Sequence, residues 1–394
     1  MKKLAIVTAT RAEYGLLSRL IRMFKVSDKI DTHLIATGSH LSKEYGMTIQ
    51  EIEKDGITVD KRIDILSNDN SEYGISETMS NAIKYFSAYF KEFRPDAILV
   101  LGDRYEILAI CIAAVNYKIP IIHLYGGEAT LGALDELIRN AITKLSILHF
   151  TSTEEYRNRV IQMGEDPSRV YNVGALGVEN IKEIPLLSKR ELEYELKVKL
   201  DEYAVMTYHP TTTENDILQK QIDDIIRVMV NNPQIMFICT KANADVGGAQ
   251  INTALKGAAN KYNNIILFDS LGIKKYLSAV KYCDFVIGNS SSGIIEVPTF
   301  HVPTINIGNR QKGRIQAKSI INCSDKYEDI QQAIKIACSK EFILNLENIV
   351  NPYEKDLTAK RIFDIINKRF DEENICIVKK FYDLPYINSR LFIE

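Results

Sequence analysis

The sequence predicts an α/β protein made of two Rossmann-like domains, each with a doubly wound parallel sheet. A chain of 394 residues exceeds the size of an ordinary domain, so two domains are expected. Short β-branched apolar runs alternate with longer amphipathic stretches, which is the pattern of strands joined by helical crossovers. Runs such as AILVLG and DFVIG are apolar on consecutive residues, as expected for parallel strands covered by helices on both faces.

The predicted strands form two groups along the chain. Those of the first half are Leu4–Thr8, Thr32–Ala36, Ala97–Leu101, Pro120–Leu124, Ile147–Thr151 and Arg169–Val173. Those of the second half are Ala204–Tyr208, Ile235–Thr240, Asn264–Phe268, Asp284–Ile287 and Pro303–Ile307. This repeated alternation of strand and helix patterns predicts two doubly wound units.

The domain boundaries are predicted from composition. Residues 1–178 form the first domain, and the charge-rich stretch 179–201, which contains Pro185, is expected to be a linker. Residues 202–350 form the second domain. The last stretch, 351–394, has a helical pattern followed by the aromatic run FYDLPYINSRLF, and we expect it to cross back onto the first domain.

Charge and hydropathy narrow the classes of partner. The 46% hydrophobic and 25% charged fractions are typical of soluble globular proteins. Lysine and arginine number 49 against 51 aspartate and glutamate, so no basic footprint for nucleic acid is expected. The apolar run Leu4–Val7 is shorter than the roughly 7–15 residues that a secretion signal needs. No run has transmembrane length, and we therefore expect a cytoplasmic protein without a membrane partner.

The sequence predicts neither a metal site nor a bound cofactor. The six cysteines form no C-x-x-C pair and are expected to be reduced, mostly buried side chains. No Walker lysine motif and no G-x-G-x-x-G run is present, which argues against an ATPase or an ordinary NAD enzyme.

Polar residues gather where the predicted strands of the first half end, and ligands bind at the carboxyl ends of strands in open α/β sheets. Arg11 lies where a helix begins and would reinforce that positive helix end as an anion site, although a surface arginine near a cap fits equally well. His40 follows the second strand and by itself is more often a loop histidine. The strand AILVL runs into Asp103 and Arg104, a pair that could hold a base beside an anionic leaving group.

Three carboxylates, Asp103, Glu128 and Asp135, follow neighbouring strand ends. Each has a plain alternative, such as a helix cap for Asp103. Uncompensated carboxylates brought together raise one another's pKa, which makes an acid or base useful near neutral pH. Gly126 and Gly127 permit a sharp turn and close approach of a ligand. We therefore expect acid–base chemistry at this edge.

In the second half, His209 follows a strand and is a candidate general acid or base, because its unperturbed pKa of about 6.5 suits both roles. The run GNSSSGIIEVP leads from a strand through a Ser/Gly turn into a helix. Ser290 and Ser291 would offer hydroxyls and backbone N–H groups to a phosphate, and Glu296 could accept from both ribose hydroxyls. A serine cap with a helical glutamate is the plainer alternative.

Seven motifs together make a specific resemblance. They are TRAEYG, TGSHLS, LGDRYE, GGEATLGALDELIRNAITK, QMGEDPSRV, GNSSSGIIEVP and INIGNRQKGR. Their order over residues 1–320 resembles that of the hydrolysing UDP-N-acetylglucosamine 2-epimerases of sialic acid biosynthesis. The resemblance implies a glycosyltransferase B-type arrangement, an active site between the two domains, and a homodimer or homotetramer.

The resemblance also implies residue roles. The catalytic positions are Asp103, Glu128, Asp135 and His209; the nucleotide positions are Arg11, Arg104, Ser290, Ser291, Glu296 and Arg310; the sugar positions are His40 and Asn243. Two departures stand out, because Tyr125 replaces a glutamate that is catalytic in many relatives and Asn140 replaces a histidine. Glu128 is expected to take over the task of the missing glutamate.

The implied reaction converts UDP-N-acetylglucosamine and water to N-acetylmannosamine and UDP. UDP leaves from C1 while a carboxylate removes the C2 proton, and water then adds to the resulting 2-acetamidoglucal. Three alternatives stay open: the same reaction on UDP-2,4-diacetamido-2,4,6-trideoxyglucose of the legionaminic acid pathway, a glycosyltransferase on the same fold, and a non-catalytic nucleotide-sugar sensor.

Overall fold

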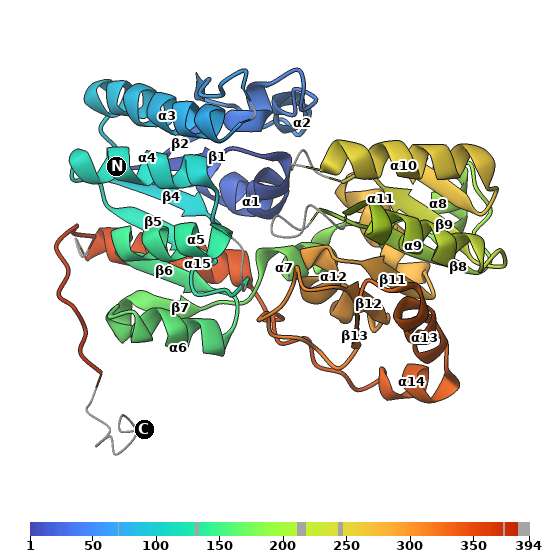
Figure 1. The fold of residues 1–394 in the computed structure, drawn as a ribbon. Coiled ribbons are helices and arrows are strands. Elements are labelled where there is room, and N and C mark those ends of the chain that lie inside the picture. The colour runs from blue at the N-terminus through green and yellow to red at the C-terminus, as the bar shows by residue number, and fades with distance from the viewer. Residues whose placement is uncertain (70, 131–133, 211–217, 243–246, 373–374, 385–394) are drawn as a thin grey trace, which may run out of the picture. The chain divides into compact units, whose positions relative to one another are not determined.

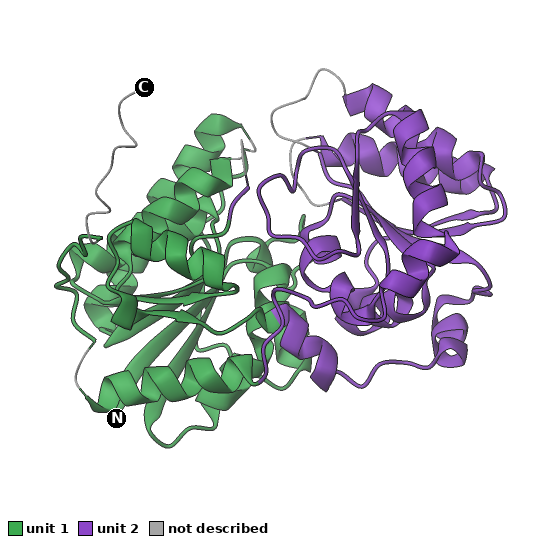
Figure 2. Ribbon diagram, turned by 90° about the horizontal axis from the view of Figure 1, so that it is seen from below, with its two compact units in different colours: residues 1–128, 134–176, 357–394 green, residues 129–133, 177–356 purple. Residues whose placement is uncertain are grey.

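The computed structural model divides the chain into two compact units, each with its own sheet (Figures 1 and 2). The structure describes residues 1–394 except 70, 131–133, 211–217, 243–246, 373–374 and 385–394. The first unit comprises residues 1–128, 134–176 and 357–394, and the second comprises residues 129–133 and 177–356.

The first unit contains a seven-stranded parallel sheet in the order β3-β2-β1-β4-β5-β6-β7 (Figure 1). Its strands are β1 (Lys2–Thr8), β2 (Ile30–Thr37), β3 (Lys61–Ile63), β4 (Ala97–Leu101), β5 (Ile121–Leu124), β6 (Leu148–Thr151) and β7 (Val170–Asn172). Its helices are α1 (Arg11–Lys25), η1 (Gly38–Leu41), α2 (Ile49–Lys54), α3 (Glu72–Glu92), α4 (Tyr105–Asn116), α5 (Leu134–Leu145), α6 (Glu154–Gln162), η2 (Pro167–Arg169) and α15 (Thr358–Asp371).

Alternating side chains of the first sheet build two cores, one on each face. Leu4 and Ile6 of β1 pack with α1, α2 and α15. Ala5 and Val7 pack on the other face with α3, α4 and α5. Helices α1 and α4, which follow two neighbouring strands, therefore cover opposite faces of the sheet.

The second unit contains a six-stranded parallel sheet in the order β10-β9-β8-β11-β12-β13. Its strands are β8 (Tyr203–Thr207), β9 (Met236–Thr240), β10 (Ile265–Phe268), β11 (Phe285–Gly288), β12 (Thr304–Ile307) and β13 (Ile320–Cys323). Its helices are α7 (Leu176–Glu183, beginning on the last residue of the first unit), α8 (Lys189–Leu196), α9 (Leu218–Val230), α10 (Gly248–Lys261), α11 (Gly272–Tyr282), α12 (Ser291–Ile295), η4 (Val297–Phe300), α13 (Tyr327–Ala337) and α14 (Lys340–Asn345).

The predicted fold class is confirmed, and every predicted strand is present with its ends moved by at most a few residues. Two edge strands, β3 and β13, were not predicted. Only one of the three residues of β3 is buried, and no residue of β13 is. Neither strand could therefore show the continuous apolar run that marks a buried parallel strand.

Helices occupy much of the stretch 179–201, for which we predicted a linker. Leu192 and Leu196 of α8 are buried in a core of the second unit, together with residues of α11. In the last stretch of the chain, Ile362 and Ile366 of α15 are buried in the core of the first unit. Thr358 anchors the start of this helix, because its hydroxyl donates to the carbonyl oxygen of Val173 at 2.7 Å.

The remaining features of the fold concern membrane-spanning helices, metal-binding groups and the state of the cysteines. Among the described residues, no helix combines the length and the apolar character required to cross a bilayer. The same residues contain no group of three or more His, Cys, Asp or Glu side chains that could hold a metal ion. Cys111, Cys239 and Cys283 are buried free thiols, whereas Cys338 and Cys376 are exposed.

Each sheet has one place where the strand order reverses. In the first sheet it lies between β1 and β4, and in the second between β8 and β11. The helices that leave such a pair of strands lie on opposite faces, and this opens the ligand-binding position of doubly wound folds. The polar residues at these two switch points are therefore the first candidates for function.

Strands β8 and β11 approach each other closely at Gly288, the last residue of β11. Its φ is +137°, and a Cβ atom there would lie 1.9 Å from the carbonyl oxygen of Thr207. Gly288→Ala is expected to reduce the free energy of unfolding by at least about 3 kcal/mol. Gly257, exposed in α10 with open space around it, is the control, and Gly257→Ala should add roughly 0.5–1 kcal/mol. Urea denaturation of both variants measures this, and equal stabilities would contradict the described turn.

Candidate functional site

The turn after β1 places a cation and a buried carboxylate at the first switch point. Thr10 caps α1, and its hydroxyl accepts the backbone N–H of Glu13 at 3.2 Å. The Oε2 of Glu13 accepts the backbone N–H of Ala9 at 2.7 Å. Arg11 is the exposed first residue of α1. Its guanidinium therefore belongs to the positive end of the helix, where an anion is favoured.

Asp103, at the end of β4, has a buried guanidinium as its partner. Arg139 of α5 donates to Oδ2 of Asp103, and its Nη1 donates to the carbonyl oxygen of Glu128 at 2.7 Å. The Arg139 side chain is 1% exposed and that of Asp103 is 27% exposed. We expected uncompensated carboxylates here, and this was wrong for Asp103 because Arg139 supplies the counter-charge.

Arg139 was missed by the sequence analysis although it lies within a motif that was singled out. Ile138 and Ile142 of the same helix are buried in the core. An arginine among such apolar positions was the available signal, since a buried guanidinium is rarely found without an anionic partner.

Glu128 and Asp135 lie in different environments. Glu128 is buried and accepts the hydroxyl of Ser152 at 3.0 Å. Asp135 is exposed in the first turn of α5. The turn before Glu128 requires glycine, because Gly127 has a φ of +79° and a Cβ there would lie 2.4 Å from the carbonyl oxygen of Tyr156. The two carboxylates therefore differ in solvent access, since Glu128 is buried and Asp135 is exposed.

His123 joins the ends of β4 and β5 beneath the site. Its Nε2 lies 2.8 Å from the carbonyl oxygen of Gly102, which precedes Asp103. Its Nδ1 lies 3.3 Å from the hydroxyl of Thr143. Burial lowers the pKa of His123 to about 3, so the ring is neutral. Sequence reasoning assigned this histidine no role, because only the paired strands bring it under Gly102.

The two predicted sugar positions are placed unequally. His40 is fully buried, with Nε2 3.0 Å from the hydroxyl of Thr8 and Nδ1 2.9 Å from that of Thr48. Burial lowers the pKa of His40 to about 4. Both ring nitrogens therefore contact hydroxyl groups of the protein. Asn243 lies outside the described residues, and both assignments stay predictions.

Tyr125, which stands where the resemblance leads one to expect a glutamate, reaches the beginning of α7. Its hydroxyl accepts the backbone N–H of Leu176 at 2.8 Å. Its φ of +70° lies in the left-handed region, which is costly for a bulky residue. The Tyr125 side chain is thus held at the first residue of α7.

Asn289 links the ends of β8 and β11 at the second switch point. Its Oδ1 accepts the backbone N–H of His209 at 2.7 Å, and its Nδ2 donates to the carbonyl oxygen of His209 at 2.8 Å. Arg310 and Gln311 donate to the carbonyl oxygen of Asn289 at 3.1 and 2.8 Å. Asn289 therefore ties the segment after β8 to the segment after β12. Its role was not predicted, because its partner His209 lies 80 residues away in the sequence.

His209 differs from the ordinary histidine that we expected. Burial, reinforced by the positive charge of Arg310, lowers its pKa to about 3. The ring is consequently neutral at neutral pH in the free protein. A neutral ring can accept a proton or donate an N–H hydrogen bond, and an anion bound near Arg310 would make it more basic.

The predicted phosphate turn folds into a short helix. Ser290 is the N-cap of α12 (Ser291–Ile295), and its hydroxyl accepts the backbone N–H of Ser292 at 3.4 Å. Glu296 follows directly and is half-buried. Burial and the negative charge of Glu296 raise the pKa of Tyr276. Glu296 and the two predicted serines therefore lie at opposite ends of one short helix.

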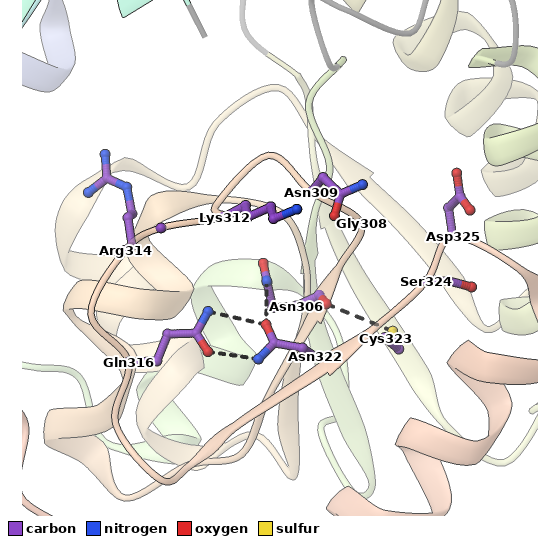
Figure 3. A pocket seen from close by; sticks show the side chains of 11 residues that line it. Asn306, Gly308, Asn309, Lys312, Arg314, Gln316, Asn322, Cys323, Ser324 and Asp325 are labelled. Atoms are coloured by element: carbon purple, nitrogen blue, oxygen red, sulfur yellow. Dashed lines mark hydrogen bonds between the residues drawn. The ribbon is translucent and has the colours of Figure 1, made fainter. Parts of the chain in front are cut away.

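The motif INIGNRQKGR lines a polar cavity of about 730 Å³ at the carboxyl ends of β12 and β13 (Figure 3). Gln316 and Asn322 exchange two hydrogen bonds, and Asn306 donates to the same carboxamide of Asn322 at 2.8 Å. Lys312 and Arg314 add positive charge to the lining. The cavity is built within the second unit alone, and Arg310 is not among its lining residues.

Comparisons with known proteins agree with the motifs. Residues 22–367 match a protein family described as UDP-N-acetylglucosamine 2-epimerase. The chain is 41% identical over 388 residues to the polysialic acid biosynthesis protein P7 of Escherichia coli, covering 98% of both chains. It is 42% identical over 385 residues to the hydrolysing GDP/UDP-N,N'-diacetylbacillosamine 2-epimerase of Campylobacter jejuni, covering 97% of this chain and 99% of that protein.

The fold is also similar to that of a solved structure. The UDP-N-acetylglucosamine 2-epimerase of Neisseria meningitidis, bound to UDP-N-acetylglucosamine, superposes with a TM-score of 0.79 at 18% identity. The match covers 93% of this chain and 100% of that one. At this identity the similarity supports the fold.

The environment of His209 generates a prediction. In the free protein its ring should titrate with a midpoint near pH 3, well below the ordinary value of about 6.5. Arg310→Gln should raise this midpoint because it removes the neighbouring positive charge. Arg369→Gln, in the first unit, is the matched control and should leave the midpoint unchanged. NMR of the imidazole signals measures it, and a midpoint near 6.5 in the parent protein would show that His209 is not buried as described.

Proposed function

The chain belongs to the UDP-N-acetylglucosamine 2-epimerase family, and we propose that it hydrolyses UDP-N-acetylglucosamine with inversion at C2, giving N-acetylmannosamine and UDP. The reaction type, hydrolysing 2-epimerisation of a nucleotide sugar, is supported by the family match and by the 42% identical relative. The observation that carries the proposal is the partly exposed carboxylate of Asp103, held by buried Arg139 at the switch point of the first sheet.

In this proposal the second unit binds the nucleotide. Ser290 and Ser291 would donate to phosphate oxygens, and Glu296 would accept from the two ribose hydroxyls. The positive charge of Arg310 acts on the neutral ring of His209, so a cation lies in this neighbourhood before any ligand binds. Such charge favours a diphosphate.

The first unit would act on the sugar. In the first step the C1–O bond breaks and UDP leaves, while Asp103 takes the C2 proton and the C2–H electrons form the C1=C2 bond. Because the C2–H bond is barely acidic, cleavage of C1–O must run ahead, and the positive charge that develops at C1 is stabilised by carboxylates. Arg11 and Arg104 would stabilise the departing diphosphate.

In the second step water adds to the glucal. The water oxygen bonds to C1, and a proton is delivered to C2 on the face opposite to that from which it was removed. Asp135, Glu128 and His209 are the proposed sources of that proton. Elimination followed by hydration leaves the overall oxidation level of the sugar unchanged, so the reaction calls for no redox partner.

The C. jejuni relative supports a second substrate, the UDP-2,4-diacetamido-2,4,6-trideoxy sugar. Incubating the protein with each UDP-sugar, without any acceptor, and identifying the products by NMR compares the two. We expect UDP and N-acetylmannosamine from UDP-N-acetylglucosamine. Faster turnover of the diacetamido sugar would move the assignment to that substrate. Release of UDP only when an acceptor sugar is added would indicate a glycosyltransferase, and no release at all would indicate a sensor.

Glu296→Ala should weaken UDP binding at least tenfold. A ribose that loses a paired carboxylate loses two charge-assisted hydrogen bonds, each worth roughly 1.5–3 kcal/mol. Glu328→Ala, an exposed glutamate in the first turn of α13, is the control in the same unit. Calorimetric titration with UDP measures both, and equal affinities would remove Glu296 from the nucleotide site.

Asp103→Asn should lower kcat at least about 100-fold, which corresponds to roughly 2.7 kcal/mol of transition-state stabilisation. The amide keeps the size of the side chain and can still accept from Arg139, but it is no base. UDP affinity should change less than threefold. Asp364→Asn, in an exposed pair with Lys360, is the control. If kcat of the Asp103 variant stays within threefold of the parent, Asp103 is not the base.

A further inference from the structure

Two glutamates meet at the first switch point from opposite faces of the sheet. Glu13 belongs to α1 and Glu106 to α4, and they are 6% and 2% exposed. Helix α1 packs on one face of the sheet and α4 on the other. They follow β1 and β4, which pair in parallel with Ile6 beside Leu99. The reversal of strand order therefore brings both carboxyl groups to the same pair of strand ends.

Each carboxyl group is held through one oxygen. Glu106 Oε1 accepts Nε of Arg104 at 2.5 Å, and Glu13 Oε2 accepts the backbone N–H of Ala9 at 2.7 Å. The other two oxygens, Oε1 of Glu13 and Oε2 of Glu106, are buried and have no hydrogen-bond partner within the part of the chain that the structure describes. A buried carboxylate oxygen without a donor is costly.

A single proton shared between the two groups would satisfy both oxygens. Two neighbouring buried carboxylates do not both ionise readily, because each disfavours the charged form of the other. Glu106 is paired with Arg104, whose own pKa this carboxylate raises. Burial and the negative charge of Glu106 raise the pKa of Glu13 to about 8, so Glu13 holds the proton at neutral pH.

We propose that Glu13 and Glu106 share one proton and act together as positioning residues for Arg104. Glu106 fixes the guanidinium through Nε, which leaves the two terminal amino groups outside that contact. The Arg104 side chain is 41% exposed, so a ligand can reach it. This inference rests on the proposed function in one respect, namely that the ligand is the diphosphate of a UDP-sugar.

The charge of the cluster then depends on pH. With Glu13 protonated, the cationic Arg104 and the anionic Glu106 sum to zero. Loss of the proton leaves one net negative charge beside the proposed diphosphate position, and an anionic ligand should bind more weakly above about pH 8.

Other titratable groups lie around the pair. They are Tyr105 beside Arg104, Asp103 paired with Arg139, His40 beneath the end of β2, Tyr14 of α1 paired with Asp55, and Arg11 at the start of α1. Burial and Glu106 raise the pKa of Tyr105 above its ordinary value of 10, and burial lowers that of His40 to about 4, so neither changes charge between pH 6 and pH 9. Glu106 and Arg104 are the charged groups whose interaction with Glu13 shifts its pKa.

The shared proton also links folding to pH. The folded protein retains the proton of Glu13 up to about pH 8, whereas the unfolded chain loses it near its ordinary value of 4.5. The folded state therefore binds more protons between these values, and the contribution of Glu13 to stability falls as pH rises through this window. Glu13→Gln keeps an acceptor for Ala9 and a donor toward Glu106, but does not titrate.

The first experiment is a melting series of the ligand-free protein from pH 5 to pH 9. Glu191→Gln is the matched control, because Glu191 occupies the same N3 position in the capping box of α8 but is exposed. The parent and the control should lose melting temperature as pH rises through this range. Glu13→Gln should lose less and should melt above the parent at pH 9. Identical slopes in all three proteins would overturn the shared proton.

The second experiment measures UDP affinity at pH 7.5 and pH 9. The parent should bind at least fivefold more weakly at pH 9, whereas Glu13→Gln should change less than twofold between these pH values. Glu106→Leu should bind UDP at least tenfold more weakly at both, because Arg104 loses the oxygen that holds its Nε. An equal pH dependence in the parent and Glu13→Gln, or full affinity in Glu106→Leu, would overturn the positioning role. Failure of the parent to bind UDP at all would instead contradict the proposed function, while the melting series still decides on the shared proton.

Discussion

The parallel pairing of β1 with β4 and of β8 with β11 fixes where the candidate site residues of each unit lie. At each pair the strand order reverses, so the following helices leave on opposite faces and their first residues surround the same strand ends. Arg11 follows β1 and Asp103 follows β4 at this junction in the first unit. His209 follows β8 and Asn289 follows β11 in the second, where two hydrogen bonds lock the junction.

The charged groups at the first switch point form ion pairs in which one partner is buried. Arg139 is nearly inaccessible, yet it holds the more accessible carboxylate of Asp103, and Glu106 holds Arg104 in the same manner. Buried ion pairs add little net stability, since desolvation offsets their attraction, but removing one partner is costly. Their consequence here is orientation, because the carboxylate of Asp103 and the guanidinium of Arg104 are each held by a buried partner.

Sequence patterns were sufficient for the fold and for the positions of some candidate site residues, whose roles stay predictions. Continuous apolar runs located β4 and β11, and the strand-end rule located Arg11, Asp103 and His209 at switch points. The edge strands β3 and β13 were missed because pairing with a neighbour, and no apolar pattern, defines them. Arg139 and Asn289 were missed because their partners lie 36 and 80 residues away in sequence, so only the tertiary structure brings them together. The low pKa of His209 likewise follows from burial, which a local motif does not encode.

We propose that C2 is inverted by elimination and hydration rather than by simple hydrolysis of the sugar nucleotide. Turnover of the UDP-sugar in deuterium oxide, and separately in oxygen-18 water, tests this most directly by mass spectrometry of both products. We expect deuterium at C2 of the released sugar, oxygen-18 at its C1, and unlabelled UDP. Simple hydrolysis would label C1 and leave C2 unepimerised, and attack on phosphorus would label UDP. A released sugar that keeps its original hydrogen at C2 would contradict the mechanism.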